Sequence, residues 1–235
     1  NTTEYIQDLT KKEVDLDLLP RHTLDYFTRL ASQVGIDPVL PILSFKEDKP
    51  AITNVALFEN DRYVGEVSLA ESFLINQLKT KVSETPIDAR VPTDKYKDRI
   101  SYENEATQNN EFIYLSFILR KGSGTIKIDD FDALTFKAEV QMRAELLETS
   151  IPMDIKTEET TKKLEKDIED YYKKEYEKLF DKLQEVKSDA FGLGRQYVAT
   201  RQGSKTTDEQ WREKYQDASV EFKVDFLIEH FGTID

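Results

Sequence analysis

The sequence contains no cysteine and only two histidines among its 235 residues. Disulfide bridges, thiolate zinc sites and cysteine nucleophiles are therefore excluded for this chain. Neither His22 nor His230 stands at a spacing that would pair it with an acid and a nucleophile, or with a second metal ligand. The sequence thus predicts no catalytic triad, no histidine metal site and no cofactor.

Long apolar runs and basic clusters are missing as well. No stretch approaches the ~18 apolar residues that a membrane-spanning helix needs. The formal net charge is −13, whereas a nucleic-acid binder needs a clustered basic surface, so nucleic acid is excluded as a partner. Anionic lipid headgroups would repel such a chain, so a membrane location would require an anchor. Because the chain begins at Asn1 rather than at a methionine, we expect a longer native protein.

What the sequence does contain is typical of a globular protein. Hydrophobic residues make up 38% of the chain and aromatic residues 11%, and this length suits one large or two modest domains. The patterns below predict the α+β fold class with two domains. We expect a helix–hairpin–helix α/β domain (1–95), a linker (96–110), and a C-terminal domain (111–235) whose largely antiparallel or mixed β-sheet packs against long α-helices.

The first half begins with a helix pattern. Pro20 fits the first position of a helix, and Gly35 fits its stop. The stretch DPVLP (37–41) is interpreted as an extended loop. Two β-rich runs, AITNVALF (51–58) and YVGEV (63–67), flank the residues ENDR and predict a hairpin.

A second helix is predicted directly after this hairpin. Ser68 and Glu71 form the pattern of a capping box, and apolar residues follow at helical spacing. Residues 83–110 are mostly polar and are interpreted as a connection with one short strand, so the domain boundary is placed there.

The second half carries long strand patterns. EFIYLSFILR (111–120) is apolar at odd and even positions, which predicts a strand covered on both faces. KGSG (121–124) predicts a turn, and TIKID (125–129) a short return strand. Alternation over 134–146, and again over 220–228, predicts two long strands that share a sheet and bury one face each.

A long charged helix is predicted between these two strands. From 157 to 187 apolar residues recur at spacings of three and four, as on one face of a helix. The stretch SDAFGLGRQY (188–197) follows, and then a further helix around Trp211.

The two glycines of SDAFGLGRQY raise the question of a phosphate-binding loop. A dinucleotide fingerprint needs a preceding strand and a third glycine, and a Walker loop needs a lysine after its last glycine. Here a helix precedes, and Arg195 follows Gly194. The pair is therefore interpreted as structural: Gly192 ends the long helix in a left-handed conformation, Gly194 lets the chain turn, and Phe191 fills the core.

The acidic residues single out no catalytic or metal site. Asp129, Asp130 and Asp132 gather in a predicted turn but lack the spacing and the glycine of an EF-hand loop. Hydrolysis by a carboxylate pair stays open as an alternative because 46 acidic residues always provide pairs, yet no pair stands out.

The order of these motifs resembles the C subunits of bacterial spore germinant receptors, the Ger(x)C family. ALFENDRYVGEVSLAES (56–72) is similar to one family segment, and SDAFGLG (188–194) to its D-x-FG-x-G corner, although Ala190 stands where the family often has proline. A tryptophan helix and a charged alternating strand complete the order. The residues that carry the resemblance are Phe58, Gly65, Glu71, Phe191, Gly192, Gly194 and Trp211.

The resemblance extends from about residue 18 to the end and implies the middle and C-terminal domains of such a subunit. It implies a non-enzymatic role in spore germination, through contacts with the integral-membrane subunits of a nutrient receptor. It also implies an N-terminal lipid anchor upstream of this chain and a location at the outer face of the spore inner membrane.

One further alternative remains open. A membrane-anchored solute-binding protein that itself binds the nutrient would share the same context, but it would need a deep cleft with convergent polar groups.

Overall fold

The computed structural model describes residues 24–46, 49–100, 110–155, 157–200 and 205–231. Its elements, in chain order, are α2 (Leu24–Ala31), β1 (Val39–Lys46), β2 (Lys49–Glu59), β3 (Arg62–Ser68), α3 (Leu69–Gln77), β4 (Thr85–Pro92), the 3-10 helix η1 (Thr93–Tyr96), β5 (Phe112–Asp130), β6 (Thr135–Thr149), α5 (Glu158–Glu185), α6 (Leu193–Val198), α7 (Asp208–Tyr215) and β7 (Ser219–Phe231).

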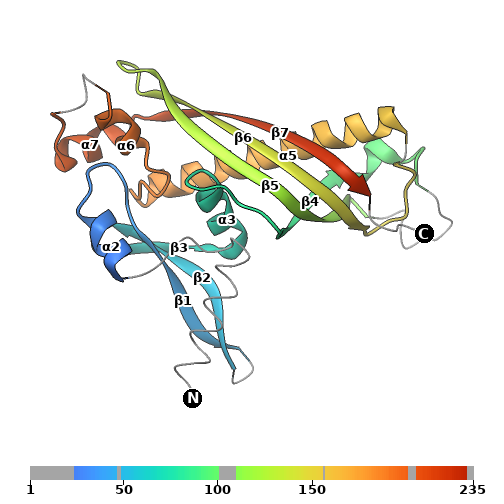
Figure 1. Ribbon diagram of the computed structural model, residues 1–235, viewed down its shortest axis with the longest axis horizontal. Helices are drawn as coiled ribbons and strands as arrows, with labels where there is room; N and C mark the ends of the chain where they lie inside the picture. Colours follow the sequence, from blue (N-terminus) through green and yellow to red (C-terminus); the bar gives the residue numbers. More distant parts are fainter. Residues whose placement is uncertain (1–23, 47–48, 101–109, 156, 201–204, 232–235) are drawn as a thin grey trace.

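These elements form two sheets, which confirms the predicted α+β class. The smaller sheet has the order β1-β2-β3 and is antiparallel. The larger has the order β4-β5-β6-β7; its first three strands are antiparallel, and β7 runs parallel to β6. We call β1–β3 with α2 and α3 the small lobe, and β4–β7 with α5–α7 the large lobe (Figure 1).

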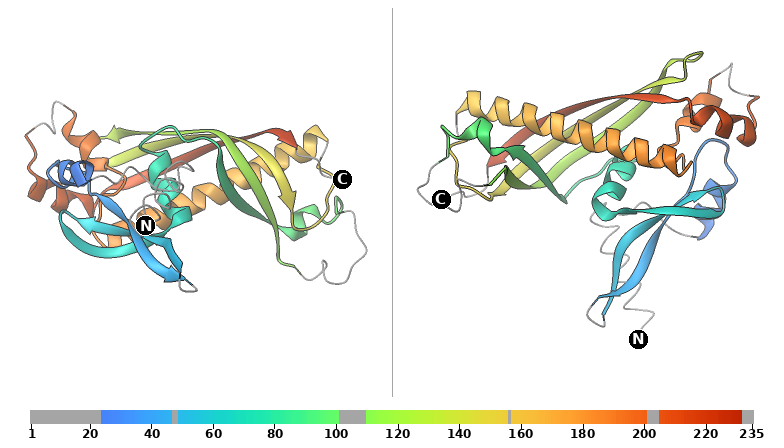
Figure 2. Two further views of the ribbon diagram at one scale, coloured as in Figure 1. Left: turned by 60° about the horizontal axis from the view of Figure 1, so that its bottom comes forward. Right: turned by 180° about the vertical axis from the view of Figure 1, so that it is seen from behind.

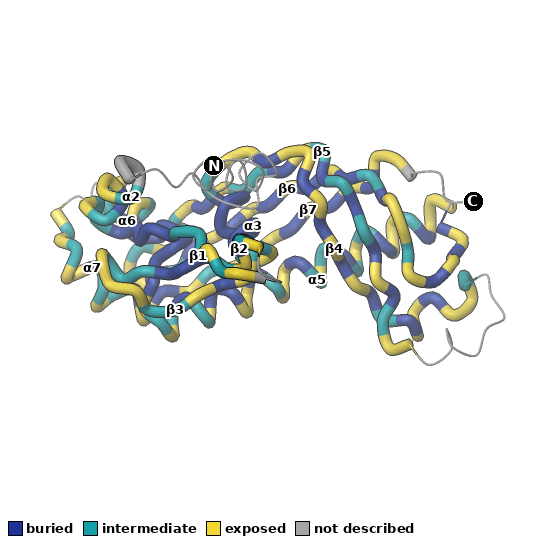
Figure 3. Tube along the Cα trace, turned by 90° about the horizontal axis from the view of Figure 1, so that it is seen from below, coloured by how far each residue is buried: buried dark blue, intermediate teal, exposed yellow. Residues whose placement is uncertain are grey.

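The long helix α5 covers one face of the large sheet (Figures 1 and 2). Its 28 residues make it about 42 Å long. It begins at the cap Thr157, whose side chain accepts the N–H of Thr160 at 3.3 Å. Buried and exposed positions alternate along β4, as Figure 3 shows, because successive side chains point to the covered face and to the opposite, open face. The buried positions of α5 repeat every three or four residues: Thr160, Leu164, Ile168, Tyr172, Tyr176, Leu179, Phe180 and Leu183.

The alternation predicted for the last two strands is confirmed. The even positions of β6 are buried from Phe136 to Leu146, and those of β7 from Phe222 to Ile228. The two strands are neighbours over almost their whole length. One contiguous hydrophobic core joins them to α5 and extends into the small lobe.

The turn predicted at KGSG (121–124) is wrong, and so is the separate return strand over 125–129. Strand β5 runs straight through both as one 19-residue strand. Its glycines serve close packing instead of a turn: a Cβ at Gly122 would lie 2.7 Å from Cγ2 of Val82, and one at Gly124 2.8 Å from a side-chain carbon of α3's C-cap residue.

The chain turns instead between β5 and β6, at the acidic stretch. The carboxylate of Asp130 accepts the backbone N–H groups of Asp132 and Ala133, both at 2.9 Å. The first half of β5 is also not covered on both faces as predicted. Its odd positions are buried against α5, whereas Tyr114 is 57% exposed on the open face.

Two stretches outside the predicted hairpin and the long strands also form strands. DPVLP was interpreted as loop, but β1 starts at Val39. The short strand expected in the connection over 83–110 is confirmed as the eight-residue β4, which pairs with β5 and therefore lies in the large sheet. The division into 1–95, 96–110 and 111–235 stays a prediction. The predicted helix start at Pro20 lies outside the described residues.

The long helix does not end at Gly192, as the sequence suggested. Lys187 takes the left-handed conformation, with φ of 58°. Its N–H donates to the carbonyl of Gln184 at 3.0 Å, and the N–H of Ser188 donates to the carbonyl of Leu183 at 2.9 Å. This is the Schellman pattern. Gly192 is indeed left-handed, with φ of 77°, but it caps the start of α6.

Candidate functional site

Most of the predicted motif residues lie in or beside the region where the two lobes meet. The connection between α2 and β1 lies directly on the stretch between α5 and α6. The N–H of Asp37 donates to the carbonyl of Asp189 at 3.0 Å, and the N–H of Asp189 donates back to the Asp37 carboxylate at 2.7 Å. The N–H of Arg195 donates to the carbonyl of Gly35 at 2.8 Å. Backbone pairing of this kind fixes the small lobe against the large one. We call this contact, between the residues around Gly35 and Asp37 and those from Asp189 to Arg195, the joint.

Two glycines allow this approach. A Cβ at Gly194 would lie 2.3 Å from Nε1 of Trp211 and 2.4 Å from Cα of Gly35. A Cβ at Gly35 would lie 2.2 Å from the carbonyl carbon of Gly194, and its φ is 76°. Side chains at either position would therefore push the lobes apart.

Asp189 is the centre of this joint. Its buried carboxylate accepts the N–H groups of Gly192 at 2.8 Å, Leu193 at 2.9 Å and Gly194 at 2.8 Å. The indole N–H of Trp211 adds a fourth bond at 3.0 Å. Burial nevertheless raises the pKa of Asp189 to about 6. Because protein donors satisfy both oxygens, the carboxylate fits a structural role.

Asp37 is the second buried carboxylate of the joint. It accepts the N–H of Asn60 at 2.8 Å and the guanidinium of Arg212 at 2.8 and 3.3 Å. Arg212 in turn bonds the carboxylate of Asp208 at 2.7 Å. We call Asp37, Asp189, Trp211 and Arg212 the corner cluster.

Lys79 lies beside the corner cluster, just after α3. Its ammonium nitrogen is buried and, within the described residues, has no hydrogen-bond partner. Burial lowers the pKa of Lys79 to about 8, although the negative charges of Asp189 and Asp37 oppose this shift. The joint therefore contains a buried ammonium that the surrounding groups do not bond.

Two predicted motif residues fill the core below this joint. Phe191 stacks on Phe180 with ring centroids 6.2 Å apart and meets Phe222 edge-on at 6.0 Å. Trp211 is 1% exposed and packs edge-on against Phe136 at 6.3 Å. Phe191 thus fills the core as predicted.

The other predicted motif residues lie in the small lobe. Glu71 completes the capping box of α3, as predicted, and also binds Lys182 of α5 at 3.0 Å. Gly65 lies on β3, where a Cβ would meet Val186 at the end of α5 at 3.5 Å. Phe58 contacts the aromatic rings of α2 and β3. Glu71 of α3 and Gly65 of β3 therefore also lie next to α5, on the small-lobe side of the contact between the lobes.

Sequence reasoning missed four residues of the joint. Asp37 lies in DPVLP and Asp189 in SDAFGLG, two of the motifs of the sequence. Only the fold shows that these two residues are hydrogen-bonded to each other. Nothing in the sequence marks Arg212, a charged residue in the last turn of α7, or Lys79, which follows the C-cap of α3.

A hollow of about 420 Å³ lies beside this joint, between α3, β4 and α5. Its walls are largely apolar and aromatic, and its charged groups are all acidic. The lining residues are Ser68, Ala70, Glu71, Phe73, Leu74, Pro86, Ile87, Asp88, Tyr171, Tyr172 and Glu175.

The described part of the chain holds no group of three or more histidine, aspartate or glutamate side chains arranged for a metal ion. Asp129 pairs with Lys137 at 2.9 Å, and Asp130 accepts from its own turn. His22 lies outside the described residues. Among the helices of the described ranges, none has both the length and the apolar composition of a membrane span.

Comparisons with known proteins agree with the motif order. The model of the family "Spore germination B3/GerAC like, C-terminal" matches residues 53–232. The crystal structure of the GerBC protein is similar in fold, with a TM-score of 0.60 and 14% identity, over 91% of this chain and 65% of that chain. This chain therefore spans less than two thirds of that protein. No curated protein sequence matches. Since the family model covers more than half of the chain, the chain belongs to the spore germination B3/GerAC-like family of germinant receptor C subunits.

Proposed function

We propose that this chain acts in spore germination as part of a germinant receptor C subunit, through contacts with integral-membrane subunits rather than by catalysis. The observation that carries the proposal is the family match over residues 53–232. The GerBC-like fold supports it. The full-length protein is then held at the outer face of the spore inner membrane by a lipid anchor upstream of this chain.

The roles of the motif residues support a non-enzymatic subunit. Gly194 and Trp211 build the joint between the lobes, and Glu71 caps a helix and pairs across that joint. Residues engaged in packing, capping and buried hydrogen bonds position surfaces rather than reacting groups.

The hairpin of β1 and β2 is the surface that we infer to contact a partner. It projects away from the large lobe (Figure 1). On β1, Phe45 is 76% exposed and Leu43 is 41% exposed. Large exposed apolar side chains close together are typical of protein-binding surfaces.

The strand edges support the same assignment. The outer edge of β7 is blocked, because Glu169 accepts the N–H of Phe226 at 3.2 Å and Glu165 accepts the N–H of Ile228 at 2.9 Å. β1 is the edge of the small sheet, and no side chain of the described residues caps its outer backbone groups in this way. An open edge beside apolar side chains suits an added strand from a partner.

Spore germination tests the proposal. The gene is deleted in its native spore former, spores are exposed to a panel of nutrients, and the fall in optical density is followed. We expect loss of response to one nutrient class and recovery with the full-length gene. A gene that lacks the lipid-anchor cysteine should not restore the response.

Two matched variants then test the hairpin. Leu43→Ser with Phe45→Ser should fail to restore germination, while Leu147→Ser, at an apolar residue 44% exposed on the large lobe, should restore it. Protein amounts are compared by immunoblot. Normal germination of the deletion strain on every nutrient, or equal behaviour of the two variants, would contradict the proposal.

The hollow beside α3 favours the second candidate, a subunit that itself binds the nutrient. Its aromatic walls and acidic rim suit a small molecule with a cationic group. Calorimetry of the chain with amino acids and sugars tests it. Saturable heat that Tyr171→Ala removes would favour this candidate over the first.

A further inference from the structure

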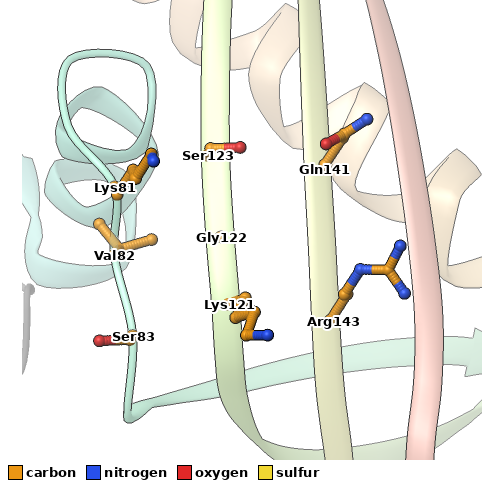
Figure 4. Close-up of a pocket in the computed structure, with 8 residues that line it drawn as sticks. All are labelled: Lys81, Val82, Ser83, Lys121, Gly122, Ser123, Gln141 and Arg143. Atoms are coloured by element: carbon orange, nitrogen blue, oxygen red, sulfur yellow. The ribbon is translucent and has the colours of Figure 1, made fainter.

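A basic hollow lies on the open face of the large sheet, away from the corner cluster. Figure 4 shows Lys81, Lys121 and Arg143 around Gly122, on three neighbouring segments. The hollow has a volume of about 440 Å³. Its lining residues include three cations and no carboxylate: Lys81, Val82, Ser83, Lys121, Gly122, Ser123, Gln141 and Arg143. In a chain with a formal net charge of −13, this concentration of positive charge is unusual.

The backbone fixes these side chains in place. The N–H of Val82 donates to the carbonyl of Gly122 at 2.9 Å, and the N–H of Gly122 donates back at 2.8 Å. Lys81 and Ser83 flank Val82 and therefore lie on the same face as the neighbours of Gly122. Gly122 permits this approach because a Cβ there would overlap Val82. The hollow is thus built on a rigid backbone frame.

The charges of the hollow are left largely unpaired. Lys121 lies directly opposite Arg143 in the β5–β6 register, a like-charge pair that destabilises a sheet. Within the described ranges, no carboxylate pairs with Lys81 or Lys121. In the same ranges, Arg143 makes one ion pair, with Glu229 at 3.6 Å.

Two other cations of the same sheet are paired with carboxylates. Arg120 binds the carboxylates of Glu84 and Glu145, and Lys137 binds Asp129 at 2.9 Å. The two lysines of the hollow differ from Arg120 and Lys137 in this respect, and they converge on one hollow together with Arg143.

The donors of the hollow suit one class of ligand. Two ammonium groups and a guanidinium supply positive charge, and two hydroxyls and an amide supply neutral hydrogen bonds. Arginine binds phosphate oxygens in a bidentate manner, and lysine binds them as a point charge. A monovalent anion would leave most of this charge unbalanced, whereas a phosphate dianion would balance two of the three charges. We propose that this hollow binds a phosphate group, either free or carried by a small molecule or a lipid.

Calorimetry with inorganic phosphate at pH 7.5 and low ionic strength tests the proposal on this 235-residue chain. We expect saturable binding that weakens as chloride is added, because salt screens such contacts. Lys121→Gln and Arg143→Gln should each weaken binding by about tenfold or more, since each removes a charge-assisted hydrogen bond. Both residues are exposed, so the variants should fold.

Lys127→Gln is the matched control. Lys127 is exposed on the same strand, opposite Lys137 and outside the hollow, so its loss removes the same charge from the chain without touching the hollow. Phosphate affinity should change less than twofold. An effect equal to that of Lys121→Gln would show general charge attraction and overturn the proposal.

A second arm identifies the source of the phosphate group. Sedimentation with vesicles that contain phosphatidic acid, whose terminal phosphate can carry two negative charges, is compared with sedimentation with vesicles of phosphatidylcholine alone. Vesicle binding that Lys121→Gln removes, without binding of inorganic phosphate, would indicate a lipid headgroup. Binding of inorganic phosphate without vesicle binding would indicate a soluble ligand. Absence of binding in both arms would overturn the proposal.

Discussion

The buried ammonium of Lys79 gives the sharpest test of the joint between the lobes. Its pKa falls from 10.5 to about 8, mainly because of burial. At about 1.4 kcal/mol per pKa unit, this fall corresponds to roughly 3 kcal/mol of lost stability at neutral pH. The fall already includes the attraction of Asp189 and Asp37. Lys79→Met, which keeps a long unbranched side chain and removes the charge, should therefore raise the free energy of unfolding by a few kcal/mol at pH 7.

The gain should depend on pH with a definite sign. Between pH 8 and pH 10.5 the unfolded chain keeps the Lys79 proton while the folded chain loses it. The wild type therefore gains stability as the pH rises through this window, and the variant does not. The difference between them should shrink from pH 7 to pH 10.

Urea unfolding at pH 7, 8, 9 and 10 and constant ionic strength measures this difference. Lys166→Met, at an exposed position of α5, is the matched control and should change stability by less than about 0.5 kcal/mol. A Lys79→Met variant that is less stable than the wild type at pH 7 would refute the reasoning, as would a gain that is equal at pH 7 and pH 10.

Three further predictions concern single elements. Gly194→Ala should lower the free energy of unfolding in urea by about 2 kcal/mol or more, because its Cβ would overlap Trp211 and Gly35. Gly65→Ala, whose Cβ makes an ordinary contact at 3.5 Å, should lower it clearly less. Equal losses would argue against the close approach of Gly194 to Gly35 and Trp211. Lys187→Gly should raise the melting temperature, because a non-glycine residue in the left-handed conformation carries about 1 kcal/mol of strain that glycine avoids. A lower melting temperature would contradict the assignment of Lys187 as the left-handed residue that ends α5. The double variant Glu165→Ala with Glu169→Ala should self-associate more in sedimentation velocity, because the edge N–H groups of β7 lose their acceptors. An unchanged sedimentation coefficient would count against the role of the two glutamates in blocking this edge.

Local patterns predicted much of this fold. The capping box of Ser68 and Glu71 and the alternation over 134–146 each depend on neighbours in sequence, and both were confirmed. The order of motifs was enough to indicate the family. These signals are local because a cap or a strand face is set by residues only a few positions apart.

The errors arose where a local pattern serves a distant contact. KGSG has the composition of a turn, yet Gly122 is required because Val82 lies against it. Lys187 ends α5 although glycine is the usual residue there. The pairing of Asp37 with Asp189 joins positions 152 residues apart, and no spacing in the sequence predicts it.

One short segment connects the joint with the basic hollow. It follows α3 and carries Lys79, whose ammonium is buried beside the corner cluster, and Lys81, which lines the hollow on the open face. Val82 fixes this segment to β5 through two backbone hydrogen bonds. A phosphate group bound in the hollow would hold Lys81 and β5 together, and so would stabilise the segment that packs Lys79 against the joint. Because a ligand that binds only the folded chain raises stability by mass action, phosphate should raise the melting temperature of the wild type. It should do so far less in Lys121→Gln, and an equal rise in both would show that phosphate does not stabilise the chain through the hollow.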